Sequence, residues 1–252
     1  MKPTAWASDL LDLLLPAGCV ACRSWIPGGG DAPLVCARCR SRLREAAWPR
    51  CPRCHHPRGS GRPEAERCPE CEAWPDALTA ARYAYVLGTP SDDLVHALKY
   101  EGWSELADVM GDAVARQVAM LTVPQREARV IVPVPTTAER LRSRGYNQAE
   151  LLARRVARVC RLRLEVGLVR TGARASQTAL TPHERRENVR GAFRPAPGAH
   201  RIRGARVVLV DDVLTTGATA SEAASTLVEM GAASVTLATY ARALATAPEK
   251  AE

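Results

Sequence analysis

Long apolar runs are missing from this chain of 252 residues. No stretch reaches the roughly 18 uncharged apolar residues of a membrane-spanning helix, and this excludes membrane insertion. The apolar run at 10–19 has elements of a lipoprotein cleavage box, but Asp9, Asp12 and Pro16 interrupt that pattern. We expect an amphipathic helix over residues 1–17 instead, and a cytoplasmic protein.

Lysine and aromatic residues are also scarce. Lysine occurs only at positions 2, 99 and 250, and none stands in the Gly-x-x-x-x-Gly-Lys-Ser/Thr loop of a nucleotide triphosphatase. The Gly-x-Gly-x-x-Gly pattern of dinucleotide binding is absent as well. Aromatic residues make up 4% of the chain, with one phenylalanine, so the sequence shows no stacking shelf for a purine or pyrimidine.

Arginine supplies the positive charge that lysine does not. Residues 140–206 hold 17 Arg, 4 Glu and no Asp, a net charge of +13 within a chain of +8. The planar guanidinium group matches two phosphate oxygens at once. This concentration indicates a phosphate-rich partner, either a nucleotide-like ligand or nucleic acid. An arginine-rich coding bias explains the shortage of lysine, but not this clustering.

Eight of the nine cysteines form four Cys-x-x-Cys pairs, and the second two pairs repeat the first two at a shift of 32 positions. Four thiolates per copy suit one tetrahedral zinc ion, so residues 18–74 predict a double zinc ribbon with two structural sites. Disulfides are the rival interpretation, which a cytoplasmic chain disfavours. The repeat favours sequential sharing of the metals, although interleaved sharing also satisfies the spacing. The expected ligands are Cys19, Cys22, Cys36, Cys39, Cys51, Cys54, Cys68 and Cys71.

Residues 80–243 predict a larger α/β domain, followed by a flexible tail at 244–252. Alternating strands and helices indicate a mainly parallel sheet with flanking helices. Expected strands are 81–88, 128–135, 162–170, 206–210 and 234–242; expected helices are 91–100, 104–121, 147–160 and 218–230. Leu151, Leu152, Val156 and Val159 would form the apolar stripe of the third helix, with Cys160 as a buried thiol. The polar excursion at 171–192 is of the kind that tends to be functional.

The peptide VVLVDDVLTTGAT at 207–219 carries the strongest signal of a site. In an open α/β sheet, ligands bind beyond the carboxyl ends of the strands, where Asp211 and Asp212 follow an apolar run. The next loop leads into a helix, whose first N–H groups favour an anion. The peptide therefore offers carboxylate acceptors for sugar hydroxyls beside a phosphate cradle, and a phosphorylated pentose has both groups.

The same peptide resembles the phosphoribosylpyrophosphate (PRPP) motif of type I phosphoribosyltransferases at all 13 positions. VPVP at 132–135, RGYNQ at 144–148, ALKYEG at 97–102 and SQTAL…ERRENVRGAF at 176–193 are similar to the ComF family. The resemblance covers nearly the whole chain, including the cysteine pairs. It implies a double zinc ribbon joined to a type I phosphoribosyltransferase fold.

The resemblance also implies roles for individual residues. Asp211 and Asp212 would bind the ribose hydroxyls as the catalytic pair, with Mg²⁺ carried by the pyrophosphate. The 5′-phosphate loop would be Leu214, Thr215, Thr216, Gly217, Ala218 and Thr219. The pyrophosphate loop and the mobile hood would contribute Pro135, Thr136, Thr137, Arg140, Arg144, Arg185, Arg186, Asn188 and Arg190. Lys99 is interpreted either as a contact to phosphate or single-stranded DNA, or as a solvated lysine at a helix end.

Two functions follow from this resemblance. One is a phosphoribosyltransferase with an unknown acceptor, active in DNA uptake or nucleotide metabolism. The other is a non-catalytic competence factor that binds single-stranded DNA, uses PRPP as a ligand and works with DNA-processing proteins. Sparse aromatic residues favour contacts to the DNA backbone over base stacking, and hence a steep salt dependence.

Overall fold

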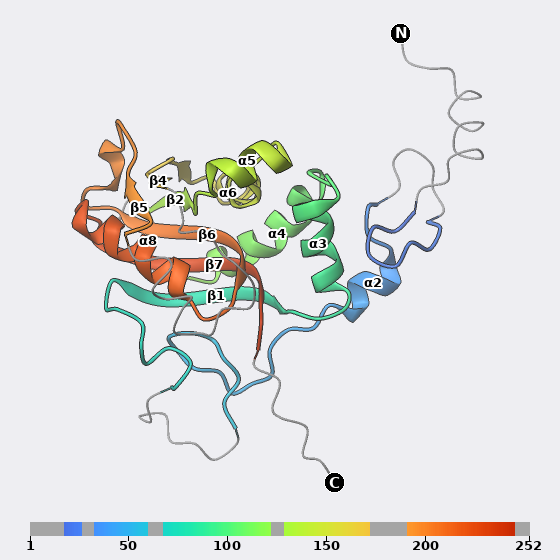
Figure 1. The fold of residues 1–252 in the computed structure, drawn as a ribbon. Coiled ribbons are helices and arrows are strands. Elements are labelled where there is room, and N and C mark those ends of the chain that lie inside the picture. Colours follow the sequence, from blue (N-terminus) through green and yellow to red (C-terminus); the bar gives the residue numbers. More distant parts are fainter. Residues whose placement is uncertain (1–17, 27–32, 60–67, 122–128, 172–190, 245–252) are drawn as a thin grey trace.

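The computed structural model describes residues 18–26, 33–59, 68–121, 129–171 and 191–244. The amphipathic helix expected at 1–17, most of the excursion at 171–192 and the tail from 245 onward lie outside these residues. The described part contains a five-stranded sheet in the order β1-β7-β6-β2-β3 (Figure 1). All its strand pairs are parallel, which confirms the mainly parallel sheet that the sequence predicted. Its strands are β1 Leu78–Val86, β7 Ser234–Arg242, β6 Arg206–Leu214, β2 Arg129–Pro133 and β3 Arg163–Leu164.

The helices between these strands lie near their predicted bounds, because their apolar faces recur at helical spacing. Short elements complete the domain: the helix α5, the 3₁₀ turn η2 at His200–Ile202, and an antiparallel pair of strands. The helices are α3 Ser91–Tyr100, α4 Leu106–Ala119, α5 Ala138–Arg144, α6 Gln148–Cys160 and α8 Ala218–Glu229, and the antiparallel pair is β4 Leu168–Arg170 with β5 Phe193–Pro195.

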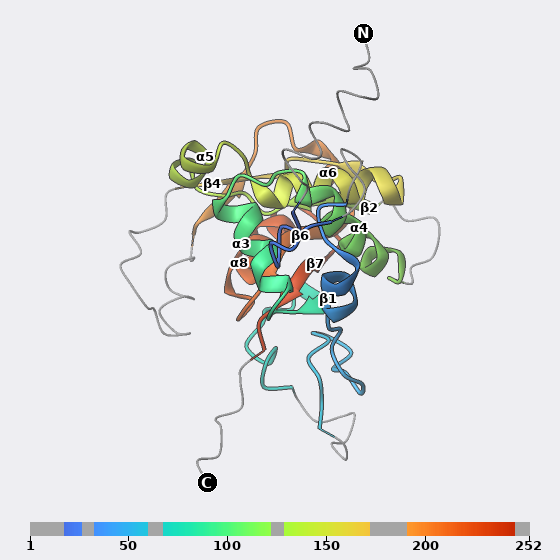
Figure 2. The ribbon, with the colours of Figure 1, turned by 90° about the vertical axis from the view of Figure 1, so that its right-hand side faces the viewer.

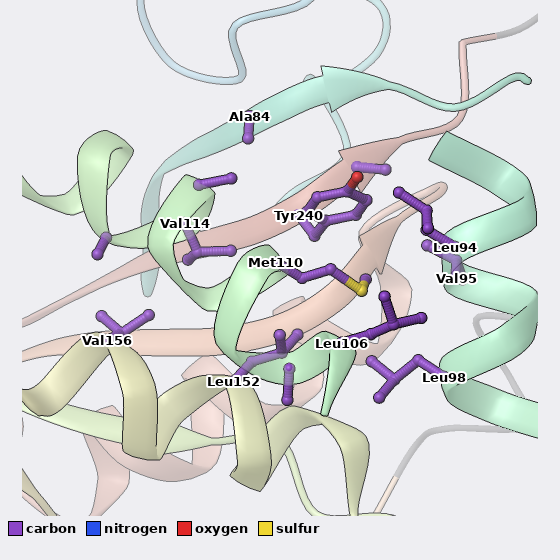
Figure 3. Close-up of a cluster of buried hydrophobic side chains, with 14 of the residues drawn as sticks. Ala84, Leu94, Val95, Leu98, Leu106, Met110, Val114, Leu152, Val156 and Tyr240 are labelled. Atoms are coloured by element: carbon purple, nitrogen blue, oxygen red, sulfur yellow. The ribbon is translucent and has the colours of Figure 1, made fainter. Parts of the chain in front are cut away.

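Alternate residues of β6 separate the two faces of the sheet. Val208 and Val210 join the core cluster beneath α3, α4 and α6, whereas Val207 and Leu209 join the cluster beneath α8. Figure 3 shows the first cluster, where Met110, Leu152 and Tyr240 converge between helices and sheet. Both faces are therefore covered, as a parallel sheet requires.

Three details of the secondary structure differ from the sequence expectations. The strand predicted at 162–170 is divided between two sheets, because residues 163–164 pair with β2 and residues 168–170 pair with β5. Gly167 lies between the two strands. A Cβ atom there would lie 3.0 Å from the Ile202 side chain, so glycine permits this close packing. Strand β6 runs four residues past the predicted end because β7 keeps pairing with it as far as Leu214. Val159 is 49% exposed, so it lies off the buried stripe of α6.

The two cysteine-rich copies, called here the first module (residues 18–26 and 33–42) and the second module (residues 50–59 and 68–74), repeat in three dimensions. The isolated bridge Gly18↔Trp25 has its counterpart 32 residues later in Arg50↔Pro57. Within the first module Ala37–Arg42 forms the short helix α2. Figure 2, turned from the view of Figure 1, shows α2 and the lighter blue chain of the second module on the side of β1.

The modules do not pack as separate small cores. Cys19, Val20 and Ile26 of the first module belong to the cluster beneath α3 and α4. Cys54 and Trp74 of the second module belong to the cluster beneath α8. Each copy therefore contributes to the packing of a different face of the sheet. Burial of its apolar side chains against the large domain stabilises it in addition to metal binding.

Candidate functional site

The carboxyl end of β6 is where the predicted loops meet. Pro133, the last residue of β2, pairs with Val210, and the Val134 amide donates to the Val210 carbonyl at 2.9 Å. The chain then leaves the sheet beside Asp211 and enters α5, where the Thr137 side chain caps the helix by accepting from the Arg140 amide at 3.3 Å. The predicted pyrophosphate loop therefore begins next to the acidic pair.

The two acids have different surroundings. Asp212 is 4% exposed, and its Oδ2 lies 3.0 Å from the Lys99 Nζ at the end of α3. Asp211 is half-buried, and its Oδ1 accepts from the Asp212 backbone amide at 2.9 Å. Lys99 is therefore not a solvated helix-end lysine, and that alternative is wrong: its ammonium group is one of the charges of the site.

Electrostatics extend the site to an arginine that the sequence analysis missed. Burial and the charge of Asp212 raise the pKa of Asp211, while the Asp212 amide, Lys99 and Arg170 lower it. Arg170, the last residue of β4, lies with its guanidinium carbon 5.4 Å from the centre of the Phe193 ring. Burial and Arg140 lower the pKa of Arg170, whereas Asp211 raises it. An arginine at the end of a predicted strand was the available signal, since strand ends are where ligands bind.

The predicted phosphate loop turns sharply between β6 and α8. Gly217 has φ +82°, in the left-handed region, and is the N-cap of α8. The Thr216 hydroxyl accepts from the Ala218 amide at 3.4 Å, and Thr215 is exposed. The turn leads into the N-terminus of α8, a helix of twelve residues. The free amides at a helix N-terminus and the positive end of the helix dipole favour binding of a phosphate group.

A tryptophan from the second module supports this turn from below. Trp74 is 6% exposed and donates from Nε1 to the Thr216 carbonyl at 3.0 Å. A Cβ atom at Gly217 would lie 2.6 Å from the same Nε1, so only glycine fits against the ring. Local sequence carried no signal for this contact, because 142 residues separate its two partners.

Two other predicted arginines have contacts or exposure that the structure describes. Arg144 stacks on Tyr100, with its guanidinium carbon 4.9 Å from the ring centre, and donates to the Gln148 side chain at 3.0 Å. Arg140 is exposed at the start of α5. The hood residues Arg185, Arg186, Asn188 and Arg190 lie outside the described residues.

The cysteines gather into two groups of four, Cys19/22/36/39 and Cys51/54/68/71, with all sulfur atoms of a group within 4.8 Å of one another. This confirms the sequential assignment and excludes the interleaved one. The Sγ–Sγ distances of 3.8 Å for Cys22–Cys36 and 3.7 Å for Cys54–Cys68 match the roughly 3.8 Å edge of a tetrahedron with Zn–S bonds of about 2.3 Å. All are free thiols. The clusters fit two structural zinc sites whose four ligands leave no open coordination position.

Cys160 was expected to be a buried thiol, but it is only half-buried. Its thiol lies 3.6 Å from the Ala115 carbonyl, and burial raises its pKa.

Within the parts of the chain that the structure describes, none of the helices has the length and apolar character needed to cross a membrane.

Comparison with known proteins covers almost the whole chain. A family model described as a double zinc ribbon domain matches residues 10–72, and one described as a phosphoribosyl transferase domain matches residues 125–252. The DNA utilization protein YhgH of Escherichia coli O6:H1 is 33% identical over 234 residues, covering 88% of this chain and 96% of that protein. Competence protein F of Haemophilus influenzae is 28% identical, covering 89% and 96%. Competence protein ComFC of Bacillus subtilis is 28% identical, covering 82% and 84%.

Proposed function

Because this chain belongs to the ComF family of double zinc ribbon and phosphoribosyltransferase domain proteins, we propose that it binds PRPP with Mg²⁺ at the carboxyl end of β6 and acts in cytoplasmic DNA utilisation. One observation carries the proposal. The acid pair Asp211–Asp212 near the end of β6 and the left-handed turn at Gly217 stand in one continuous segment that leads directly into α8. This segment supplies acceptors for a pentose and donors for its phosphate within a few residues.

Each part of the ligand has a matching group. The two carboxylates accept from the ribose hydroxyls, and the amides of residues 215–219 hold the 5′-phosphate. The pyrophosphate lies toward Thr136, Thr137 and the guanidinium groups of Arg140 and Arg170, whose repulsion an anion would relieve. Bound Mg²⁺ would neutralise part of the pyrophosphate charge. Most of its ligands would be oxygen atoms of the substrate and of water.

The reaction that fits this arrangement is displacement at the ribose C1 carbon. The bond from C1 to the pyrophosphate oxygen breaks, its electron pair stays with pyrophosphate, and an acceptor nucleophile bonds to C1. Positive charge develops on the ribose and negative charge on the leaving group. Asp211 and Asp212 face the former and Arg140 and Arg170 the latter, so the residues act by positioning and charge stabilisation.

A second candidate is a single-stranded DNA-binding factor that uses PRPP as a ligand. It is favoured by the net charge of +13 over residues 140–206. It is also favoured by Trp48 before the second module, which is 74% exposed. Exposed aromatic rings bind single strands by stacking on the bases.

Calorimetric titration separates these functions. PRPP–Mg²⁺ and a single-stranded oligonucleotide are titrated into wild type, Asp212→Asn and the control Asp92→Asn, whose acid is exposed in the first turn of α3. We expect Asp212→Asn alone to lose PRPP binding, with circular dichroism confirming that it folds. Pyrophosphate release with an added base establishes the transferase, whereas salt-dependent DNA binding without release establishes the binding factor. A wild-type protein that does not bind PRPP refutes both.

A further inference from the structure

The backbone of Trp74 is fixed by the second metal module. Its amide donates to the carbonyl of the zinc ligand Cys71 at 3.1 Å. The Arg53 guanidinium, between the ligands Cys51 and Cys54, donates to the same Cys71 carbonyl at 3.2 Å and to the Pro75 carbonyl at 2.8 Å. Trp74 therefore leaves the module at a position that the four-cysteine cluster defines.

The side chain of Trp74 reaches the tip of the proposed phosphate loop. Its indole donates to the Thr216 carbonyl, and its ring occupies the space that a Cβ atom of Gly217 would need. The turn at Gly217 has a left-handed conformation, which glycine adopts without the steric penalty that other residues meet. The buried ring therefore covers one side of the turn.

The base of the same loop is also tied to the second module. Arg242 is fully buried and donates from Nη1 to the carbonyl of the ligand Cys54 at 2.6 Å. In the sheet, Arg242 pairs with Leu214, the residue at which β6 ends and the loop begins. Contacts from one metal module thus reach the loop at both its start and its tip.

The first module has different contacts, although it is a copy of the second. Its Arg23 pairs with Glu101 after the end of α3, at 2.5 Å. Its apolar residues, such as Val20 and Ile26, pack in the cluster on the opposite face of the sheet from α8. The phosphate loop precedes α8, on the face to which the second module contributes.

We propose that Trp74 is a positioning residue through which metal binding in the second module sets the affinity for the sugar 5′-phosphate. This inference rests on the proposed function. A loop held in its binding conformation pays less ordering entropy when the phosphate arrives. With the second module disordered, the turn at Gly217 would lose both its hydrogen bond and the ring beneath it. The first module would have no such effect.

Ribose 5-phosphate is the probe, because it carries the phosphate without the pyrophosphate. Wild type, Trp74→Phe and the control Trp25→Phe, which changes a 64% exposed tryptophan of the first module, are compared by calorimetry and tryptophan emission. We expect Trp74→Phe to bind roughly threefold to tenfold more weakly, as loss of one hydrogen bond predicts. Wild type and Trp25→Phe should share one affinity and one ligand-induced emission change, and Trp74→Phe should lack that change. Inorganic pyrophosphate should bind all three proteins alike.

A second pair of variants tests the metal itself. Cys68→Ser and Cys22→Ser each remove one ligand from one module and should each lower the zinc content by one ion per chain. Only Cys68→Ser should weaken ribose 5-phosphate binding. Equal weakening in both variants, or equal affinity of Trp74→Phe and wild type, overturns the inference while leaving the proposed function in place.

The wild-type protein gives a measurement that does not depend on any variant folding. If saturating ribose 5-phosphate binds without changing tryptophan emission, Trp74 does not sense the loop and the inference is wrong. If wild type fails to bind ribose 5-phosphate and PRPP at all, the proposed function fails first, and this inference with it.

Discussion

Replacing Gly217 by alanine tests whether the ring of Trp74 fixes the loop. The new Cβ atom would lie 2.6 Å from Nε1, 2.7 Å from Cε2 and 2.9 Å from Cζ2 of the indole, all closer than van der Waals contact. It would also require a non-glycine residue at φ +82°. Two separate costs are therefore expected, and each has its own control.

Gly198→Ala measures the backbone cost alone, because Gly198 has φ +79° and a Cβ atom added there would meet nothing within 4 Å. A left-handed alanine costs about 1–2 kcal/mol, and the smaller entropy of the unfolded chain returns about 0.4–1 kcal/mol. The net loss at Gly198 is therefore about 1 kcal/mol. At Gly217, overpacking adds about 1–3 kcal/mol, for a total of about 2–4 kcal/mol.

Urea unfolding monitored by circular dichroism gives these free energies. The excess cost of Gly217→Ala should disappear when it is measured in a Trp74→Leu background, because the double-mutant cycle isolates the contact between the two residues. Ribose 5-phosphate affinity should fall in Gly217→Ala and stay unchanged in Gly198→Ala. Equal stability losses at the two glycines, or the same cost with and without the indole, would refute the view that the ring supports the loop.

Further predictions concern the charges and the metals. Lys99→Met leaves a buried carboxylate at Asp212 without its partner at 3.0 Å, so stability in urea unfolding should fall by about 3 kcal/mol. Burial and Asp212 raise the pKa of Asp211 from 3.8 to about 7, so the folded state binds the extra proton and unfolding free energy should decrease as pH rises from about 4 to 7. Asp211→Asn should reduce this dependence of the unfolding free energy on pH. If the urea midpoint changes with pH in the same way in the variant and in wild type, Asp211 is not the group responsible. Cys22→Ser with Cys36→Ser in one chain should leave one zinc ion by metal analysis, whereas a chain without zinc would show that the modules share ligands.

Local patterns were sufficient for most of the large domain. The strand at 234–242 has the bounds that its apolar run predicts, and the helix ending near Gly231 ends within a residue of its predicted place. The cysteine spacing likewise predicted both ligand sets, since a shift of 32 positions makes each copy complete. These features depend on residues that are close in sequence or on an explicit repeat.

The contacts within the site depend on tertiary structure and were harder to predict. Lys99 and Asp212 are brought together because α3 and β6 end at the same edge of the sheet. Arg170 was placed in a single long strand, and its position became clear only when the division at Gly167 moved it into a separate pair of strands. Hydrophobic periodicity among neighbouring residues carries no information about contacts between residues that are far apart in the sequence.

The duplicated modules show how a repeat can predict metal ligands correctly and still be silent about function. Equivalent cysteines bind equivalently, but the residues between them are not equivalent. Position 53 in the second copy is arginine, whereas its counterpart 32 residues earlier is Ala21; Trp74 corresponds in the same way to Arg42. The side chains that link a module to the phosphate loop therefore occur in one copy only. A shared ligand spacing preserves the metal site, while the side chains around it decide which face of the large domain that site supports.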